Sequence, residues 1–83
     1  MAGFARQDTL NRIQTLIAQE LKVDTERINE EVTFQELGAD SLDMVQIIMK
    51  LEETFGMEIN DQDAEKMKTL RDVVDYVQER RTI

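Results

Sequence analysis

Two long stretches of the chain carry hydrophobic residues at three- and four-residue spacing, and this period predicts amphipathic helices. The first stretch predicts a helix over residues 8–21, capped at its start by Asp8 or Thr9. The second predicts a helix over residues 41–55, followed by Gly56 as a left-handed C-cap. The apolar positions are Leu10, Ile13, Leu16, Ile17 and Leu21 in the first stretch, and Met44, Ile47, Ile48, Leu51 and Phe55 in the second.

Between these stretches, residues 23–40 show no sustained period. We expect an ordered long loop with one helical turn over residues 26–28, and a sharp turn at Gly38, where glycine tolerates a positive φ. Four apolar side chains allow the loop to cover a core: Ile28, Val32, Phe34 and Leu37.

The remaining residues predict two further helices. A short third helix is expected from the cap at Asn60 through about Met67. A fourth is expected after Thr69, which forms a capping box with Asp72, and Arg80 and Arg81 suit the negative end of its dipole. Its apolar stripe is Leu70, Val73, Val74 and Val77.

No alternating strand pattern competes with these helices. Because single helices of this length are marginal alone, their apolar stripes must pack against one another. The sequence therefore predicts an all-α four-helix bundle, with three longer helices, one short helix and a long first loop. We expect one domain over residues 1–83.

The charge and composition exclude several functions. The chain has 10 basic and 18 acidic residues, a net charge of −8, and neither cysteine nor histidine. Disulfides, thiolate metal sites and a Ser/His/Asp triad are therefore excluded, and the negative charge disfavours nucleic acid and anionic lipid. No apolar run is long enough to enter a membrane, and the first residues are too polar for a signal peptide. Basic protein partners are the natural complement of this charge.

The helix predicted over residues 41–55 has a second apolar stripe, opposite its core stripe. The stripe either contacts the long loop or forms a docking surface, because a small apolar patch bordered by acids suits a transient interface with a basic partner. The predicted docking residues are Asp40, Leu42, Asp43, Val45, Met49, Glu52 and Glu53.

Ser41 stands at the head of this helix, and in an anonymous sequence it would most often be only an N-cap. Its context is more specific. Residues 38–43, with the sequence GADSLD, resemble the attachment motif of acyl carrier proteins, in which the serine carries phosphopantetheine. Further agreement lies at residues 51–55, 58–59, 64–66 and 74–76.

The resemblance implies a carrier and not an enzyme. It implies that a phosphopantetheinyl transferase attaches 4′-phosphopantetheine from coenzyme A to Ser41, and that the thiol of this arm then holds acyl groups as thioesters. The DSLD sequence looks like that of free-standing carriers of type II fatty acid synthesis, which implies synthesis enzymes with basic docking patches as partners. We expect a monomer in the bacterial cytoplasm, or a mature plastid or mitochondrial protein.

The resemblance also implies that growing acyl chains enter the bundle. The expected lining residues are Phe34, Leu37, Ile59, Ala64 and Met67. The sequence departs from many relatives at Gln46, Lys50 and Asn60, which puts the choice of partner in question and leaves the carrier role intact.

Three alternatives remain open. Asp40, Ser41 and Asp43 could form a catalytic cluster, although no base accompanies them. The same fold could serve a specialised pathway such as polyketide synthesis, or act as an adaptor without cargo. A calcium loop is the third alternative, although Lys66 occupies the position that requires glycine, and we expect no dedicated metal site. Its acids would be Asp61, Asp63, Glu65 and Asp72.

Overall fold

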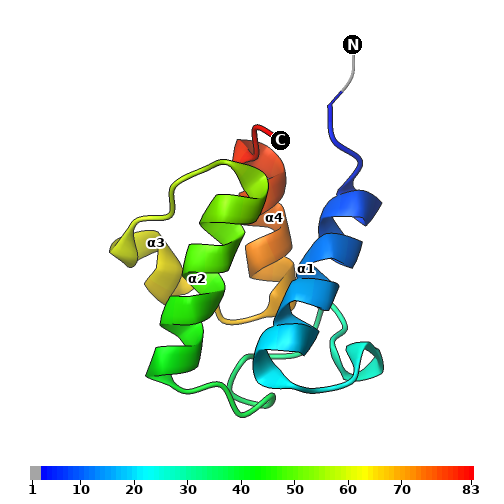
Figure 1. Cartoon of the computed structure of the whole chain (residues 1–83), viewed down its shortest axis with the longest axis vertical. Coiled ribbons are helices and arrows are strands. Elements are labelled where there is room, and N and C mark those ends of the chain that lie inside the picture. Colours follow the sequence, from blue (N-terminus) through cyan, green and yellow to red (C-terminus); the bar gives the residue numbers. More distant parts are fainter. Residues whose placement is uncertain (1–2) are drawn as a thin grey trace.

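The computed structural model describes residues 3–83 and contains four α-helices and one 3-10 helix over those residues. In chain order these are α1 (Arg6–Leu21), η1 (Thr25–Arg27), α2 (Ser41–Phe55), α3 (Asp61–Lys66) and α4 (Leu70–Arg80). Helices α1, α2 and α4 lie side by side along the long axis, and the short α3 lies beyond α2 (Figure 1). The predicted all-α bundle with a long first loop is confirmed.

The core is formed where the apolar stripes of α1, α2 and α4 meet. The predicted stripes are confirmed, because every member is buried or packs partly buried against the core. All four stripe residues of α4 are buried, whereas α2 has three buried positions of five (Ile47, Leu51 and Phe55) and α1 has two of five (Ile13 and Ile17). Phe55 is the largest side chain without solvent exposure. The buried hydrophobic residues are Ile13, Ile17, Ile28, Phe34, Leu37, Ile47, Leu51, Phe55, Ile59, Met67, Leu70, Val73, Val74 and Val77.

Helix α4 begins as its sequence predicts. The Asp72 amide donates to Thr69 Oγ1 at 3.2 Å, and the Asp72 carboxylate accepts from the Thr69 amide at 3.1 Å. This backbone hydrogen bond lowers the pKa of Asp72. The predicted Asn60 cap of α3 and the left-handed Gly56 after α2 are confirmed as well.

The start of α1 was predicted wrongly. The helix begins at Arg6 with Ala5 as its N-cap, and Asp8 and Thr9 lie in its first turn. Their side chains bond to the other end of the chain instead of capping α1. The Thr9 hydroxyl bonds to Gln78 of α4, and the Asp8 carboxylate pairs with Arg81, which follows α4. Long-range partners therefore replace the local caps. The helical turn in the long loop also lies one residue earlier than predicted, as η1.

The long loop is fastened to the start of α4. The Leu70 amide donates to the Val32 carbonyl at 3.0 Å, the Arg71 amide donates to the Glu30 carbonyl at 2.9 Å, and the Phe34 amide donates to the Lys68 carbonyl at 3.2 Å. These bonds join backbone atoms and leave no periodic signal in the sequence. They hold the loop across the end of the bundle from which α2 begins (Figure 1).

Arg81 plays a different part from the one predicted. Its side chain is only 2% exposed and donates to Asp8 Oδ2 at 3.0 Å, to Thr9 Oγ1 at 2.8 Å and to the Ile83 carbonyl. The guanidinium also lies 4.9 Å from the centroid of the Phe55 ring. Arg81 therefore joins the end of the chain to α1 and to the core, beyond any effect on the dipole of α4.

We expect Arg81→Met to lower the free energy of unfolding by about 2 kcal/mol, because it removes charge-assisted hydrogen bonds at a buried position. Urea unfolding followed by circular dichroism measures this loss. Arg80→Met is the matched control, since the Arg80 side chain is 45% exposed and pairs with the exposed Glu79. Equal losses in the two variants would contradict the role assigned to Arg81.

Candidate functional site

Ser41 is the first residue of α2 and is exposed at one end of the bundle. The chain reaches it through Gly38, which has a φ of 80°, as the predicted turn requires. The Gly38 amide donates to the Gln35 carbonyl, and the Ala39 amide donates to the Phe34 carbonyl, each at 3.0 Å. Because Phe34 is buried, this turn fixes the start of α2 to the core.

The cap of α2 is Asp40, so the interpretation of Ser41 as the N-cap is wrong. The Asp43 amide donates to Asp40 Oδ1 at 2.8 Å, and the Asp40 amide donates to Asp43 Oδ2 at 3.1 Å. This reciprocal capping box stabilises the first turn without the serine. Within residues 3–83 the Ser41 hydroxyl has no hydrogen-bond partner, and it is therefore available for modification.

The first turn of α2 also offers free amides beside this hydroxyl. The Asp43 amide is taken by the cap, and the Met44 amide donates to the Asp40 carbonyl at 3.0 Å. The amides of Ser41 and Leu42 have no acceptor among the residues that the structure describes. Unpaired amides and the positive end of the helix dipole favour an anion, so a phosphodiester on Ser41 suits this position.

The second apolar stripe of α2 faces outward. Leu42, Val45 and Met49 are 67%, 53% and 50% exposed, so the interpretation that they are covered by the long loop is wrong. Three exposed apolar side chains within two turns form a small patch on one face of the helix. We refer to Leu42, Val45 and Met49 as the α2 patch.

The acids around the α2 patch differ in what else they bind. Asp40 and Asp43 cap the helix, and Glu52 Oε2 accepts from the Ile59 amide at 2.8 Å. Glu53 is exposed and makes no side-chain bond with residues 3–83. We refer to these four acids, Asp40, Asp43, Glu52 and Glu53, as the acidic rim. The sequence predicted them as one group of docking residues, whereas in the structure the first three also form hydrogen bonds that hold the fold together.

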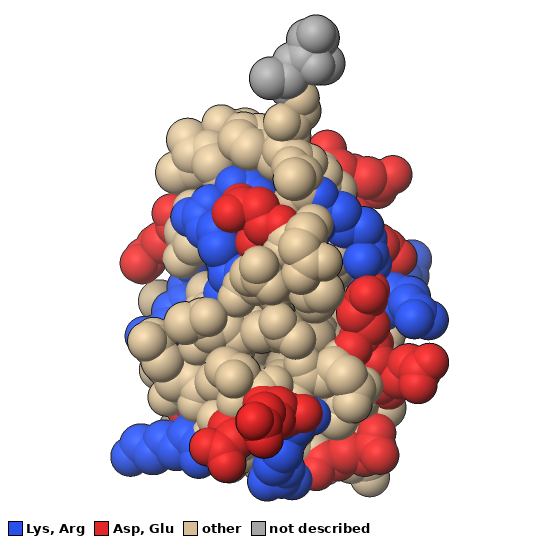
Figure 2. Space-filling model, turned by 90° about the vertical axis from the view of Figure 1, so that its right-hand side faces the viewer, with Lys and Arg blue, Asp and Glu red and all other residues tan. Residues whose placement is uncertain are grey.

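Acidic and basic side chains are distributed unevenly over the surface of the molecule. Basic side chains are interspersed with acidic ones on the α1 side of the bundle (Figure 2). Residues 40–65 contain eight acidic residues and only one base, Lys50. Lys50 Nζ lies 3.4 Å from Glu20 of α1, so part of its charge is neutralised within the fold. The region from α2 through α3 is therefore strongly acidic.

The residues predicted to line an acyl pocket lie in the core. Phe34, Leu37, Ile59 and Met67 are buried, and Ala64 is half-buried and packs against the core. They come from the long loop and from the segment around α3, and they belong to the same hydrophobic core as the stripes of the long helices. Their role toward an acyl chain remains a prediction.

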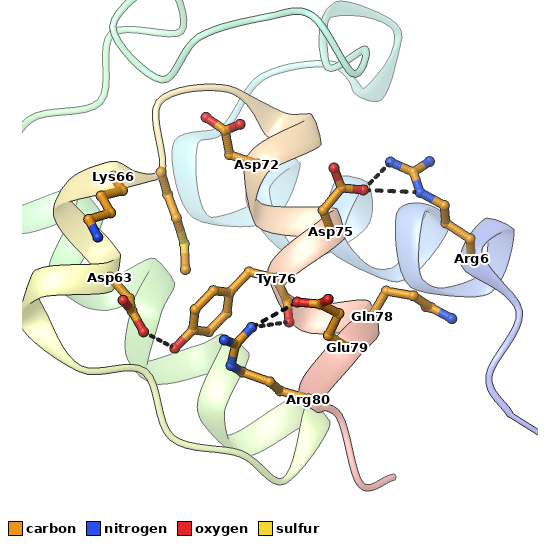
Figure 3. A pocket seen from close by; sticks show the side chains of 10 residues that line it. Arg6, Asp63, Lys66, Asp72, Asp75, Tyr76, Gln78, Glu79 and Arg80 are labelled. Atoms are coloured by element: carbon orange, nitrogen blue, oxygen red, sulfur yellow. Dashed lines mark hydrogen bonds and ion pairs between the residues drawn. The ribbon is translucent and has the colours of Figure 1, made fainter.

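A surface hollow of about 660 Å³ lies between α3 and α4 (Figure 3). Met67 is the one predicted acyl-lining residue at its wall, and most other lining side chains are charged. The Tyr76 hydroxyl donates to Asp63 Oδ2 at 2.7 Å across the hollow. Burial, followed by this hydrogen bond, raises the pKa of Tyr76. The charged wall makes this hollow a poor site for an aliphatic chain.

The structure argues against two of the alternative functions. Asp61–Lys66 is α-helical, so a 12-residue calcium loop does not form there. Within residues 3–83 no group of three or more carboxylates is placed to hold a metal ion. The Asp40 and Asp43 carboxylates form the cap of α2, and neither bonds to the Ser41 hydroxyl as a catalytic base would. No helix in residues 3–83 is long and apolar enough to cross a membrane.

Comparison with known proteins identifies the family. The family model described as the phosphopantetheine attachment site matches residues 11–77, which include all of α2. The chain is 50% identical over 78 residues to an acyl carrier protein of Rubrobacter xylanophilus, covering 93% of this chain and 96% of that protein. It belongs to the acyl carrier protein family.

A second acyl carrier protein, from Thermosynechococcus vestitus, is 47% identical over 73 residues, which cover 87% of this chain and 90% of that protein. The resemblance predicted from residues 38–43 is therefore confirmed for nearly the whole chain. The cofactor of this family is phosphopantetheine. The exposed hydroxyl and free amides at the start of α2 fit its phosphodiester.

Proposed function

We propose that this acyl carrier protein holds acyl groups as thioesters on a 4′-phosphopantetheine arm attached to Ser41, and passes them between enzymes of fatty acid synthesis. We propose that residues 1–83 act as one carrier domain, as a monomer in the bacterial cytoplasm. The main supporting observation is the exposed Ser41 hydroxyl at the first position of α2, which is released from capping by Asp40.

Attachment of the arm requires an outside enzyme. The Ser41 oxygen would attack the phosphorus atom of coenzyme A that bears the pantetheine, forming a P–O bond while the bond to the adenosine bisphosphate leaving group breaks. A base must take the hydroxyl proton, because a neutral serine is a poor nucleophile. The chain has no histidine, and Asp40 and Asp43 accept backbone amides. The transferase supplies that base, and the carrier itself catalyses no step.

The arm, when bound, supplies a terminal thiol that forms the thioester. The chain contributes a rigid anchor, since Ser41 begins a helix that is fixed by its capping box and by the turn at Gly38. The arm is therefore the flexible part of the loaded carrier, while its attachment point at Ser41 is held in place. This arrangement lets successive enzymes find the same protein surface beside a movable cargo.

We propose that these enzymes present basic residues to the α2 patch and its acidic rim. The patch provides a few apolar contacts, while Glu53 and its acidic neighbours steer a positively charged partner. An interface built on three apolar side chains and exposed acids is expected to be small and short-lived, and its affinity is expected to fall as the salt concentration rises. A carrier needs these properties because it must leave each enzyme after transfer.

We expect Glu53→Lys to lower the kcat/KM of a fatty acid synthesis enzyme for the loaded carrier by about fivefold or more at low salt, because it reverses a charge at the rim. Steady-state kinetics at two salt concentrations measure the effect. Glu26→Lys is the matched control, since Glu26 is exposed on η1 and lies outside the α2 region. Equal losses in both variants would indicate a general effect of net charge.

We propose that a bound acyl chain enters the core among Phe34, Leu37, Ile59, Ala64 and Met67. These residues are part of the packed hydrophobic core, so entry of the chain must displace core side chains. The methyl NMR signals of Ile59 and Met67 are expected to shift on acylation, while those of Ile13 in α1 stay in place. Unchanged signals at Ile59 and Met67 would contradict this pocket.

The attachment itself is tested by incubating the purified chain with coenzyme A and a broad-specificity phosphopantetheinyl transferase. Intact mass spectra are expected to show the addition of one phosphopantetheine, and peptide spectra are expected to place it on Ser41. A folded chain that gains no mass, or that gains it at another residue, would overturn the proposed function.

A further inference from the structure

Thr33 and Glu36 close a turn in the long loop, shortly before Ser41. The Thr33 amide donates to Glu36 Oε1 at 2.9 Å, and the Thr33 hydroxyl donates to the same oxygen at 3.0 Å. In return, the Glu36 amide donates to Thr33 Oγ1 at 3.0 Å. The bond from the amide, followed by the bond from the hydroxyl, lowers the pKa of Glu36, so the side chain stays an ionised acceptor at neutral pH. This reciprocal pair is a capping box of the kind that begins a helix.

The other end of the same turn is closed by backbone bonds around Gly38. The Gly38 amide donates to the Gln35 carbonyl at 3.0 Å. The Ala39 amide donates to the Phe34 carbonyl, also at 3.0 Å. With the positive φ of Gly38, these two bonds form the Schellman motif that ends many helices. Residues 33–38 are therefore one turn that carries both caps of a helix.

One side of this turn is packed into the core. Phe34 and Leu37 are buried, and the Phe34 amide donates to the Lys68 carbonyl at 3.2 Å. Thr33 is half-buried, and Glu36 is exposed to solvent. Since the buried side chains fix where the turn lies, the box of Thr33 and Glu36 is left to fix its shape.

The turn leads directly into the cap of α2. Ala39 is the last residue bonded within the turn, and it is followed by Asp40, whose side chain caps α2. Ser41 comes next, and its hydroxyl has no partner of its own within residues 3–83. The place of this hydroxyl is therefore set by the backbone of the two capped segments that meet at Ala39.

We infer that Thr33 and Glu36 are positioning residues for the modification of Ser41. In that reaction the serine oxygen loses its proton to a base of the transferase, forms a bond to phosphorus and displaces the adenosine bisphosphate of coenzyme A. The attacking and leaving oxygens must lie nearly in line, and a small misplacement of the attacking atom lowers the rate strongly. The inference rests on the proposed function, because the positioned reaction is the attachment of the arm to Ser41.

The turn is tested first in the unmodified chain, by NMR hydrogen exchange at the Leu37 and Ala39 amides, which donate within it. Glu36→Ala is expected to accelerate both rates about fivefold, because loss of a cap favours opening by about that factor. Glu31→Ala is the matched control, since Glu31 is an exposed acid of the same loop whose carboxylate has no partner within residues 3–83. Equal rates in the two variants would overturn the inference.

Transferase kinetics with coenzyme A then test the placement of Ser41. Glu36→Ala is expected to lower kcat about fivefold and to leave the KM for the carrier within about twofold, because the α2 patch is unchanged. Glu36→Gln removes the charge and keeps an oxygen acceptor, so it is expected to restore kcat. Equal losses in Glu36→Gln and Glu36→Ala would show that the charge contacts the transferase directly, and would contradict a positioning role.

Thr33→Val provides the converse variant, because it keeps the charge of Glu36 and removes the hydroxyl. It is expected to lower kcat as much as Glu36→Ala does, and Thr33→Ser is expected to restore it. The double variant of Thr33→Val and Glu36→Ala is expected to lose no more than either single variant, because the two side chains act as one box. Wild-type kcat in Thr33→Val, or additive losses in the double variant, would rule out the box.

The two experiments fail in different ways. A wild type that accepts no phosphopantetheine would overturn the proposed function and leave the exchange result intact. A wild type that is modified at the same kcat as Glu36→Ala and Thr33→Val would instead overturn the positioning role. Circular dichroism of each variant shows whether the helices are retained, so that a lower kcat is compared among folded proteins only.

Discussion

Ser41→Ala is expected to abolish attachment of phosphopantetheine while leaving the helical fold intact. Alanine has no oxygen to form the phosphodiester, so the loss is complete and does not depend on enzyme concentration. The fold is expected to persist because Asp40 caps α2, and the Ser41 hydroxyl has no partner within residues 3–83. Alanine is also a better helix former than serine.

Asp40→Ala provides the opposite variant. It keeps the hydroxyl but removes the cap, which is expected to cost about 1 kcal/mol of stability. Intact mass spectra after treatment with the transferase, together with urea unfolding curves, separate the two effects. Mass gain in Ser41→Ala would place the arm elsewhere. A larger loss of stability in Ser41→Ala than in Asp40→Ala would contradict the assigned cap.

Phe55→Ala is expected to have the largest effect on stability, a loss of about 3–5 kcal/mol, because it leaves a cavity in the core where α2 ends. The ring has no solvent exposure, and the guanidinium groups of Arg12 and Arg81 lie 4.7 and 4.9 Å from its centroid. A domain of this size has a total stability on the order of 5–10 kcal/mol. A large fraction of the variant is therefore expected to be unfolded near physiological temperature.

Thermal and urea unfolding followed by circular dichroism measure this loss. Phe4→Ala is the matched control, because Phe4 is 40% exposed and its ring also lies near Arg81, at 4.1 Å from the guanidinium. The control is expected to lose less than about 1 kcal/mol. Similar losses in the two variants would show that contact with Arg81, and not burial in the core, determines the contribution of Phe55.

The elements that the sequence predicted well are those specified by neighbours in the chain. Thr69 and Asp72 are three residues apart, and their capping box formed as expected. The apolar stripes of α2 and α4 likewise depend only on helical period. The six-residue motif that contains Ser41 pointed to the family, and the match over residues 11–77 confirms the family, while the role of Ser41 stays a prediction.

The features that were missed depend on residues distant in the chain. Arg81 and Asp8 are 73 positions apart, so nothing local showed that this arginine is buried or that α1 lacks a side-chain cap. Glu52 looked like one more surface acid, because its bond to the Ile59 amide depends on how the chain turns after α2. The pattern of hydrophobic and polar residues predicts which face of a helix is exposed to solvent. It does not predict the hydrogen-bond partner of each polar side chain on that face.

The pairing of α1 with α4 has a consequence for synthesis on the ribosome. Helix α4 supplies Val73, Val74 and Val77 to the core, and the adjoining Arg81 contacts the first turn of α1. Until residues 70–81 have emerged from the ribosome, α1 and α2 lack one wall of their shared core, and the long loop lacks the amides to which it is fastened. Translation of the earlier elements therefore yields only a nascent chain with exposed apolar stripes, and folding waits for the last helix.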